Sequence, residues 1–295
     1  MKRDVLSFAD LTADDLSELF EASRRVKGER ISSALGGKIL ALIFEKPSLR
    51  TRFTFEAGMY ELGGYAVYLA PQDIGLGKRE CVPDVARNLS RWASGIMART
   101  FEHATVTELA RYASIPVING LSDLEHPCQV LADMFTIWEK REDFSNLKLA
   151  WVGDGNNVCN SLVHASRILG FSMSIATPRG YEPRSKIEDQ RSKIKITNDP
   201  MEAVQDADVI YTDVWTSMGQ EAEREKRLEK FGEFQINGKL LNNAKRNCLV
   251  MHCLPAHRGE EITDDVIDGP HSIVFDQSEN RLHAQKALLL KLLSK

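Results

Sequence analysis

The sequence contains no long apolar run. No stretch of its 295 residues approaches the roughly 20 apolar residues that cross a bilayer. The first twenty residues, MKRDVLSFADLTADDLSELF, carry acids where a signal peptide has an apolar core. We therefore expect no membrane partner and a cytoplasmic location.

Hydrophobic residues make up 43% of the chain and charged residues 27%, which is the composition of a soluble globular protein. The length of the chain favours two domains.

The chain has few cysteines and no excess of basic side chains. Five cysteines are an odd number, which does not support a disulfide framework, so we expect free thiols. The 38 basic side chains are outnumbered by 42 acidic ones, giving a net charge of -4. A protein that coats nucleic acid needs a basic surface. We expect no nucleic-acid partner, while a local site for an anion stays open.

The third glycine of a dinucleotide-binding loop is also missing. The stretch WVGDGNNVCNSL gives G-x-G after a predicted strand, but Val158 stands where the third glycine belongs. A nucleotide-binding or redox protein is therefore a weak alternative. Asn156 and Asn157, at the carboxyl end of the strand, could instead hydrogen-bond a ligand in the crevice of a sheet.

Apolar runs alternate with amphipathic stretches along the whole chain. Strands are predicted at 38–44, 65–70, 95–99 and 115–119, and again at 147–153, 171–177, 208–214 and 248–254, with helices between them. This alternation predicts an α/β protein with parallel sheets. The helix at 127–142 is the predicted join between the two halves, and the tail ENRLHAQKALLLKLLSK is predicted to be an amphipathic helix.

Hydroxyl and guanidinium side chains alternate in EKPSLRTRFTFEAG. A helix that begins near Ser48 presents unsatisfied N–H groups and the positive end of its dipole. With the hydroxyls of Ser48 and Thr51 and the guanidinium of Arg50, it would form a cradle for phosphate. Arg50 and Arg52 point apart, so one would meet the ligand and the other would be structural. From the residues alone, a capped surface helix explains the pattern about equally well.

Two further stretches carry polar groups at predicted element ends. His126 in LEHPCQ precedes Pro127 at a helix start, where it could donate to a carbonyl or an oxyanion. An isolated histidine is more often a capping or core residue. Asp213 in YTDVWTSMGQE ends a strand and could pair with an amine, while the loop after it could close as a lid. A surface turn is the alternative.

His252 and Cys253 stand together in VMHCLPAHRGEEI. In an extended strand they would point to opposite faces, so they should not ligate one ion, and we expect no metal. The same geometry disfavours a Cys–His nucleophile pair, unless His126 or another distant histidine is the partner. A buried small hydrophobe is the alternative for Cys253.

Taken together and in this order, SLRTR, HPCQ, DVWTSMGQE and HCLPAHRGEEI closely resemble the aspartate/ornithine transcarbamoylase family, and within it the ornithine branch. The resemblance spans nearly the whole chain. It implies two α/β domains, each a parallel sheet flanked by helices. Residues 1–130 would bind carbamoyl phosphate, 131–275 would bind ornithine, and the helix at 276–295 would pack back on the first domain. A homotrimer, or a multiple of trimers, with active sites at subunit interfaces is also implied.

The resemblance implies a set of site residues. Carbamoyl phosphate would be bound by Ser48, Leu49, Arg50, Thr51, Arg99, His126, Gln129, Cys253, Leu254 and Arg281. Ornithine would be bound by Asn157, Asp213, Ser217 and Met218, and the catalytic residues would be Arg99, His126 and Cys253. Many relatives carry a glutamine before IG in the loop that reaches the neighbouring active site. This chain has Asp73 there, preceded by Gln72, so that contact is left unassigned.

The implied reaction is attack of the side-chain amine of L-ornithine on the carbonyl carbon of carbamoyl phosphate. A tetrahedral oxyanion forms, phosphate leaves, and L-citrulline is made for arginine biosynthesis, without metal or redox cofactor. A sibling enzyme that uses putrescine, N-acetylornithine or aspartate is the nearest alternative. A non-catalytic paralogue that binds metabolites and regulates a partner is another. DVWTSMG favours ornithine, because it offers groups for an α-amino acid head.

Overall fold

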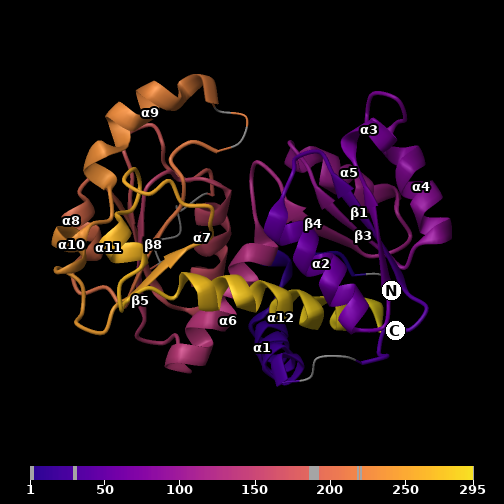
Figure 1. Cartoon of the computed structure of the whole chain (residues 1–295), viewed down its shortest axis with the longest axis horizontal. Helices are drawn as coiled ribbons and strands as arrows, with labels where there is room; N and C mark the ends of the chain where they lie inside the picture. The colour runs from indigo at the N-terminus through magenta and orange to yellow at the C-terminus, as the bar shows by residue number, and fades with distance from the viewer. Residues whose placement is uncertain (1–2, 29–31, 186–192, 218, 220, 295) are drawn as a thin grey trace. The chain divides into compact units, whose positions relative to one another are not determined.

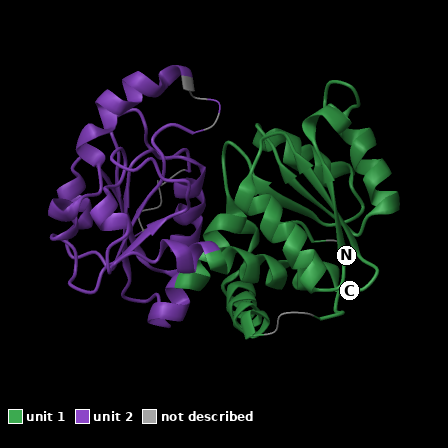
Figure 2. Ribbon diagram, in the orientation of Figure 1, with its two compact units in different colours: residues 1–136, 279–295 green, residues 137–278 purple. Residues whose placement is uncertain are grey.

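The chain divides into two compact units in the computed structural model, which describes residues 3–28, 32–185, 193–217, 219 and 221–294. Unit 1 comprises Met1–Thr136 and Glu279–Lys295, and unit 2 comprises Ile137–Ser278 (Figure 2). Among the described residues, no helix combines the length and apolarity needed to cross a membrane.

Unit 1 is built around a four-stranded parallel sheet (Figure 1). The strand order is β2-β1-β3-β4. Its elements are η1 (Phe8–Asp10), α1 (Ala13–Gly28), β1 (Ile39–Phe44), α2 (Leu49–Glu61), β2 (Tyr65–Leu69), α3 (Pro71–Ile74), α4 (Val82–Trp92), β3 (Gly95–Arg99), α5 (His103–Tyr112), β4 (Val117–Leu121) and most of α6 (Pro127–Arg141). Buried side chains of β1, β3, α4 and α5 form one apolar core.

The strand order of this sheet reverses between β1 and β3. The chain passes from β1 to β2 on one side and then returns to β3 on the other side of β1. Phe44 and Arg99 are paired where these two parallel strands end. Ligands of open α/β sheets bind at such a switch point, outside the carboxyl ends of the strands. The segments after β1 and β3 are therefore the candidate site of unit 1.

Unit 2 follows the same plan with five parallel strands in the order β7-β6-β5-β8-β9. Its elements are β5 (Lys148–Val152), α7 (Asn157–Leu169), β6 (Ser172–Ala176), β7 (Ile194–Thr197), α8 (Pro200–Val204), β8 (Val209–Thr212), η2 (Glu221–Glu223), α9 (Arg224–Phe231), η3 (Gly232–Phe234), α10 (Gly238–Leu241), β9 (Leu249–His252) and α11 (Asp264–Ile267). Here the order reverses between β5 and β8. The loops after these strands form the candidate site of unit 2.

The last helix, α12 (Val274–Leu293), joins unit 1 from Glu279 onward. Lys286 is buried and donates to Glu61 Oε2 of α2 at 2.7 Å and to the carbonyl of Val26 in α1 at 3.3 Å. Gly58 of α2 allows close approach, because a Cβ there would lie 3.4 Å from the Lys286 side chain. Figure 1 shows α12, in yellow, beside α2 and α1. The predicted return of this helix to the first domain is confirmed.

Three local features differ from the sequence-based expectation. Strand β7 (Ile194–Thr197) was not predicted, because its short, half-exposed edge position leaves little apolar signal. The segment at 71–81, for which the sequence predicts neither a strand nor a helix, contains helix α3, which Pro71 begins and Gly75 ends in a left-handed conformation. Helix α12 begins at Val274, ahead of the predicted helix bounds of 276–295.

The ion pair between Lys286 and Glu61 should stabilise the fold more than the pair between Lys291 of α12 and Glu18 of α1, whose carboxylate is exposed. The Lys286 side chain is 2% exposed, so Glu61→Gln removes a carboxylate from a buried ammonium. We expect the free energy of unfolding, from urea titrations, to fall by on the order of 3 kcal/mol. Glu18→Gln, where the carboxylate is 71% exposed, is the matched control and should change it by less than about 1 kcal/mol. Equal losses in both variants would contradict this account.

Candidate active site

Helix α2 begins where the sequence predicted a phosphate cradle. Ser48 is its N-cap, and the Ser48 Oγ accepts a hydrogen bond from the Thr51 N–H at 3.2 Å. This bond occupies one of the N–H groups that a helix start leaves unpaired, and it fixes the first turn. The end of the helix that carries the positive dipole therefore lies directly after the carboxyl end of β1.

Arg50 and Arg52 diverge, as their spacing predicted. Arg52 pairs with Glu56 at 2.9 Å one turn along α2, and its guanidinium lies 3.6 Å from the ring centroid of Tyr68. Arg52 is thus held by structural partners. Arg50 is half-buried, and it lies close enough to His126 for its positive charge to lower the pKa of that imidazole.

Arg281 of α12 is buried against the start of α2. Only 1% of this residue is exposed. Its Nη2 donates to Thr51 Oγ1 at 3.1 Å, and its Nη1 donates to Gln129 Oε1 of α6. Gln129 in turn donates through Nε2 to Asp133 at 2.8 Å. One guanidinium therefore links three elements that are far apart in sequence.

Three guanidinium groups act on the buried His126. Burial lowers its pKa well below the usual value, and the positive charges of Arg281, Arg99 and Arg50 lower it further. His126 is therefore a neutral imidazole at physiological pH, able to donate one N–H without adding charge. The structure brings together these four predicted residues of the carbamoyl phosphate site, all within unit 1.

Cys128, in the same HPCQ stretch, is a core residue. Its thiol donates to the carbonyl of Asn119 at 3.4 Å, and burial raises its pKa to about 12. A thiol with that pKa carries almost no thiolate at pH 7, so it does not act as a nucleophile.

Sequence reasoning missed Glu45, which ties the segments after β1 and β3 together. Its Oε2 accepts from the Phe101 N–H at 2.7 Å, and its own N–H donates to the Arg99 carbonyl at 2.9 Å. These bonds hold the turn that carries Arg99 against the segment that leads to α2. An acidic residue directly after a buried strand was the only local signal.

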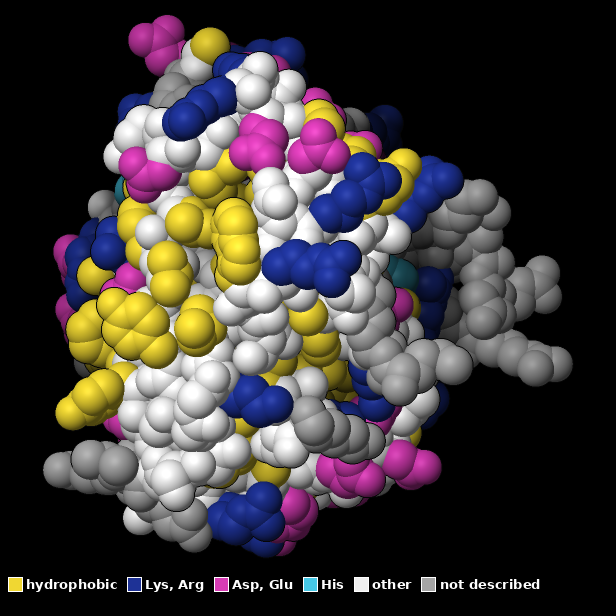
Figure 3. Space-filling model, turned by 90° about the vertical axis from the view of Figure 1, so that its right-hand side faces the viewer, with side chains coloured by type: hydrophobic (Ala, Val, Ile, Leu, Met, Phe, Trp, Pro, Cys, Tyr) yellow, Lys and Arg dark blue, Asp and Glu magenta, His cyan; other side chains and the backbone are white. Residues whose placement is uncertain are grey.

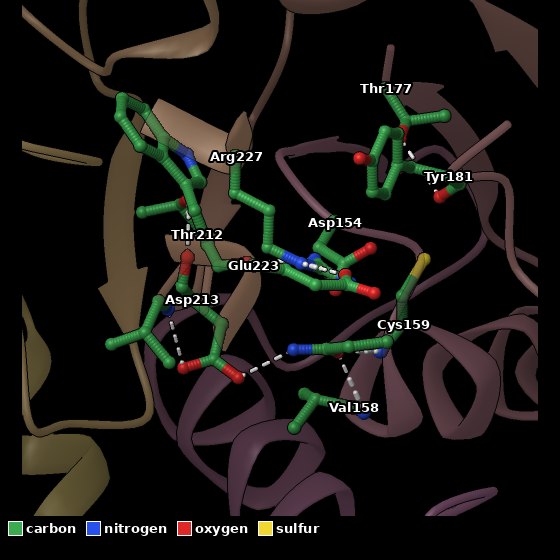
Figure 4. Close-up of polar contacts among 12 residues, drawn as sticks. Asp154, Val158, Cys159, Thr177, Tyr181, Thr212, Asp213, Glu223 and Arg227 are labelled. Carbon is green, nitrogen blue, oxygen red and sulfur yellow. Dashed lines mark hydrogen bonds and ion pairs between the residues drawn. The ribbon is translucent and has the colours of Figure 1, made fainter. Parts of the chain in front are cut away.

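Asp213 gathers three donors at the switch point of unit 2. Its Oδ2 accepts from Asn156 Nδ2 at 2.7 Å, and its Oδ1 accepts from the Val214 N–H at 2.8 Å and from the Cys253 thiol at 2.9 Å. Figure 4 shows the dashed lines that join the Asp213 carboxylate to neighbouring donors. The structure thus brings the predicted residues Asp213 and Cys253 into direct contact, from the ends of two neighbouring strands.

Asn156 has a second role at the start of α7. Its Oδ1 accepts from the N–H groups of Val158 and Cys159 at 3.0 and 3.2 Å, which caps the helix. One side chain therefore fixes both the first turn of α7 and the orientation of Asp213. Asn157, predicted to bind ornithine, is the first residue of this helix.

The glycine-containing loop after β5 serves close packing. A Cβ on Gly155 would lie 2.3 Å from the Pro183 nitrogen and 2.5 Å from the Tyr181 carbonyl oxygen. The Gly155 N–H also donates to that carbonyl at 2.8 Å. The backbone at 181–183 thus occupies the space beside this glycine, which gives the G-x-G pattern a structural cause.

Arg227 of α9 holds the loop that follows β8. Its Nη1 donates to Asp154 Oδ2 at 2.9 Å and to the Trp215 carbonyl at 2.8 Å, and Figure 4 shows the bond to Asp154. Burial raises the pKa of Asp154 to about 6, although Arg227 opposes this. Ser217 lies in the anchored loop, and Met218 lies outside the described residues. No sequence signal joined Arg227 to Asp154.

The prediction that His252 and Cys253 point to opposite faces of one strand was wrong. Strand β9 ends at His252, and ligand atoms of Asp213, His252 and Cys253 lie within 4.8 Å of one another. Both ring nitrogens of His252 are nevertheless engaged. Nε2 is 2.9 Å from Glu261 Oε1, and Nδ1 accepts from the Leu254 N–H at 2.9 Å. The imidazole thus positions the turn at Leu254.

Comparison with known proteins agrees with this arrangement. The family model described as "Aspartate/ornithine carbamoyltransferase, carbamoyl-P binding domain" matches residues 3–139, and the one described as "Aspartate/ornithine carbamoyltransferase, Asp/Orn binding domain" matches residues 145–292. The chain belongs to the aspartate/ornithine carbamoyltransferase family.

Curated relatives and solved structures of this family resemble the chain over nearly its full length. An ornithine carbamoyltransferase of Archaeoglobus fulgidus is 55% identical over 99% of this chain and 97% of the relative. An ornithine carbamoyltransferase of Methanosarcina acetivorans is 53% identical over 99% of this chain and 100% of the relative. The solved ornithine carbamoyltransferase from Pyrococcus furiosus superposes with a TM-score of 0.95 at 51% identity, covering 99% of this chain and 97% of that one.

The predicted residues of this carbamoyltransferase are divided between its two units. Unit 1 holds Ser48, Leu49, Arg50, Thr51, Arg99, His126, Gln129 and Arg281, and unit 2 holds Asn157, Asp213, Ser217, Cys253 and Leu254. Leu49 is 76% exposed, so its side chain contributes nothing to a buried site, and only its backbone could serve a ligand.

Asp154 should give the stability of the protein a distinctive pH dependence. Its pKa is about 6 in the fold against an ordinary value of 3.8, so the folded state keeps a proton that the unfolded chain releases between these limits. Its contribution to stability is therefore greatest below about pH 4 and falls as the pH rises to about 6. The unfolding free energy of Asp154→Asn minus that of wild type should therefore rise by on the order of 2–3 kcal/mol as the pH is raised from about 4 to about 6.

Urea titrations at several pH values measure this difference. Asp143→Asn is the control, because hydrogen bonds from Ser145 lower the pKa of that exposed carboxyl below 3.8. Its contribution to stability therefore changes only below about pH 4, and the difference between Asp143→Asn and wild type should stay constant from pH 4 to 6. A constant difference between Asp154→Asn and wild type from pH 4 to 6 would show that Asp154 does not titrate there.

Proposed function

We propose that this chain is an ornithine carbamoyltransferase, which transfers the carbamoyl group of carbamoyl phosphate to the side-chain amine of L-ornithine. The observation that carries the proposal is the cluster of Arg50, Arg99 and Arg281 around a neutral His126, in a chain 55% identical to an ornithine carbamoyltransferase. The products are L-citrulline and phosphate, and we assign the reaction to arginine biosynthesis.

In this proposal the start of α2 and the three guanidinium groups bind carbamoyl phosphate. The negative charge that develops lies on the carbonyl oxygen and on the departing phosphate. Arg50, Arg99 and the neutral His126 donate to these oxygens, and the start of α2 adds backbone donors. Since these groups are fixed before the reaction, they need no reorganisation as the charge forms.

The amine of ornithine has to react in its neutral form. A free alkyl ammonium has a pKa near 10, so it is protonated at neutral pH. In our proposal Asp213 pairs with the α-ammonium group, while Cys253, held by Asp213, orients the side-chain amine. As the new C–N bond forms and the C–O bond to phosphate breaks, the departing phosphate accepts the proton of the amine.

We also propose that the protein forms a homotrimer with active sites at subunit interfaces. Unit 1 exposes large apolar side chains on α2 and on its edge strand β2, namely Leu49, Phe53, Tyr60, Tyr65 and Val67. Figure 3 shows apolar side chains gathered on one face of the molecule. Exposed clusters of this kind favour protein–protein contacts.

Asp73 takes a structural role. Its Oδ2 accepts from the Ala70 N–H at 3.0 Å and caps α3, while Gln72 is exposed. We therefore assign any contact with a neighbouring active site to Gln72. Sedimentation of the purified protein tests the assembly, and a mass of a single 33.1 kDa chain would contradict it.

Initial rates with a panel of amines test the proposed activity. Carbamoyl phosphate is supplied with ornithine, putrescine, N-acetylornithine, lysine or aspartate, and both phosphate and the ureido product are measured. We expect strong preference for ornithine, with citrulline and phosphate formed one for one.

The variant Asp213→Asn tests the proposed ornithine site. It should raise KM for ornithine by about tenfold or more, because it weakens a charged hydrogen bond to the α-ammonium.

Two results would overturn the assignment. Preferred turnover of another amine would keep the carbamoyl phosphate half and reject the roles given to Asp213 and Ser217. A folded protein that binds carbamoyl phosphate but turns over no amine would be a non-catalytic paralogue.

A further inference from the structure

Gln285 is a buried residue of α12 that lies one turn after Arg281. The two are four residues apart in a helix, so they share a face. With its amide oriented to satisfy both neighbours, the Gln285 oxygen accepts from Arg281 Nη2 at 2.9 Å and from Arg281 Nε at 3.1 Å. Its amide nitrogen then donates to Thr54 Oγ1 of α2.

Thr54 continues this chain of hydrogen bonds to the start of α2. Its hydroxyl donates to the Arg50 carbonyl at 2.6 Å while it accepts from Gln285. Arg281, Gln285, Thr54 and the Arg50 backbone are thus connected by hydrogen bonds, all inside unit 1. Two of the arginines around His126 are therefore linked through residues that need not touch a ligand.

The oxygens that hold Arg281 in this network are neutral. Gln129 and Gln285 contribute amide oxygens, and Thr51 contributes a hydroxyl. A carboxylate at any of these positions would form a buried ion pair and cancel much of the positive charge. These neutral acceptors orient the guanidinium without adding negative charge beside it, and the positive charge of Arg281 lowers the pKa of His126.

We propose that Gln285 and Thr54 are positioning residues of the carbamoyl phosphate site, which hold Arg281 against α2 through neutral hydrogen bonds so that its charge serves the bound phosphate. This rests on the proposed function, because it takes the cluster around His126 as the phosphate site. Gln285 orients the guanidinium of Arg281, and Thr54 joins Gln285 to the first turn of α2.

Thr54→Val removes the hydroxyl and keeps the shape of the side chain. We expect KM for carbamoyl phosphate to rise about tenfold, because Gln285 loses the partner that orients it. KM for ornithine at saturating carbamoyl phosphate should stay within about twofold of wild type. Thr54→Ser restores the hydroxyl and should restore KM for carbamoyl phosphate.

Thr136 provides a matched control. Its buried hydroxyl also accepts from an α12 side chain, Asn280 at 3.0 Å, and donates to the carbonyl four residues earlier, Ala132 at 2.7 Å. Thr136→Val should cost stability as Thr54→Val does, without the rise in KM for carbamoyl phosphate. If the two valine variants change KM equally, or if neither does, the proposal is wrong.

Gln285→Glu and Gln285→Met give a second test that does not depend on Thr54→Val folding. The two side chains are similar in size, but the glutamate adds a carboxylate beside Arg281. We expect Gln285→Glu to bind carbamoyl phosphate at least about tenfold more weakly than Gln285→Met, measured by calorimetric titration without amine at equal folded concentrations. Equal affinities would overturn the proposal.

The same titration separates this inference from the proposed function. A wild-type protein that binds carbamoyl phosphate but turns over no amine contradicts the activity, while the variants still test the role of Gln285. A wild-type protein that does not bind carbamoyl phosphate contradicts both.

Discussion

The buried guanidinium of Arg281 is the constraint on which the arrangement of unit 1 depends. A charged group removed from water has to be hydrogen-bonded, and the partners of Arg281 come from α2, α6 and α12 itself. Thr51 and Arg281 are 230 positions apart in the chain. These bonds therefore form only when the last helix has returned to unit 1, so the returning helix completes the cationic cluster around His126.

Parallel sheet topology supplies the second constraint. In each unit the strand order reverses once, between β1 and β3 or between β5 and β8, and the polar groups follow the strands on either side of that point. Unit 1 gathers positive charge there, around a histidine kept neutral by burial. Unit 2 gathers donors around the carboxylate of Asp213. The same architecture thus presents opposite charges, as an anion and an amine would require.

Local signals made much of this predictable from the sequence. Ser48 as a helix cap, the divergence of Arg50 and Arg52, and the parallel strands follow from short-range rules, and the structure bears them out. Contacts made across long sequence separations left no comparable signal. Glu45, Gln285 and the pair of Asp154 with Arg227 become visible only in the fold. The predicted separation of the His252 and Cys253 side chains was wrong, because strand β9 ends at His252.

A crystal structure of the protein with carbamoyl phosphate would show directly where the phosphate binds. We expect the phosphate at the start of α2, with oxygens within about 3 Å of donors from Ser48, Arg50 and Thr51. The carbonyl oxygen should face Arg99 and His126. A phosphate bound elsewhere, with no ligand oxygen near the start of α2 or near Arg50, would contradict this assignment.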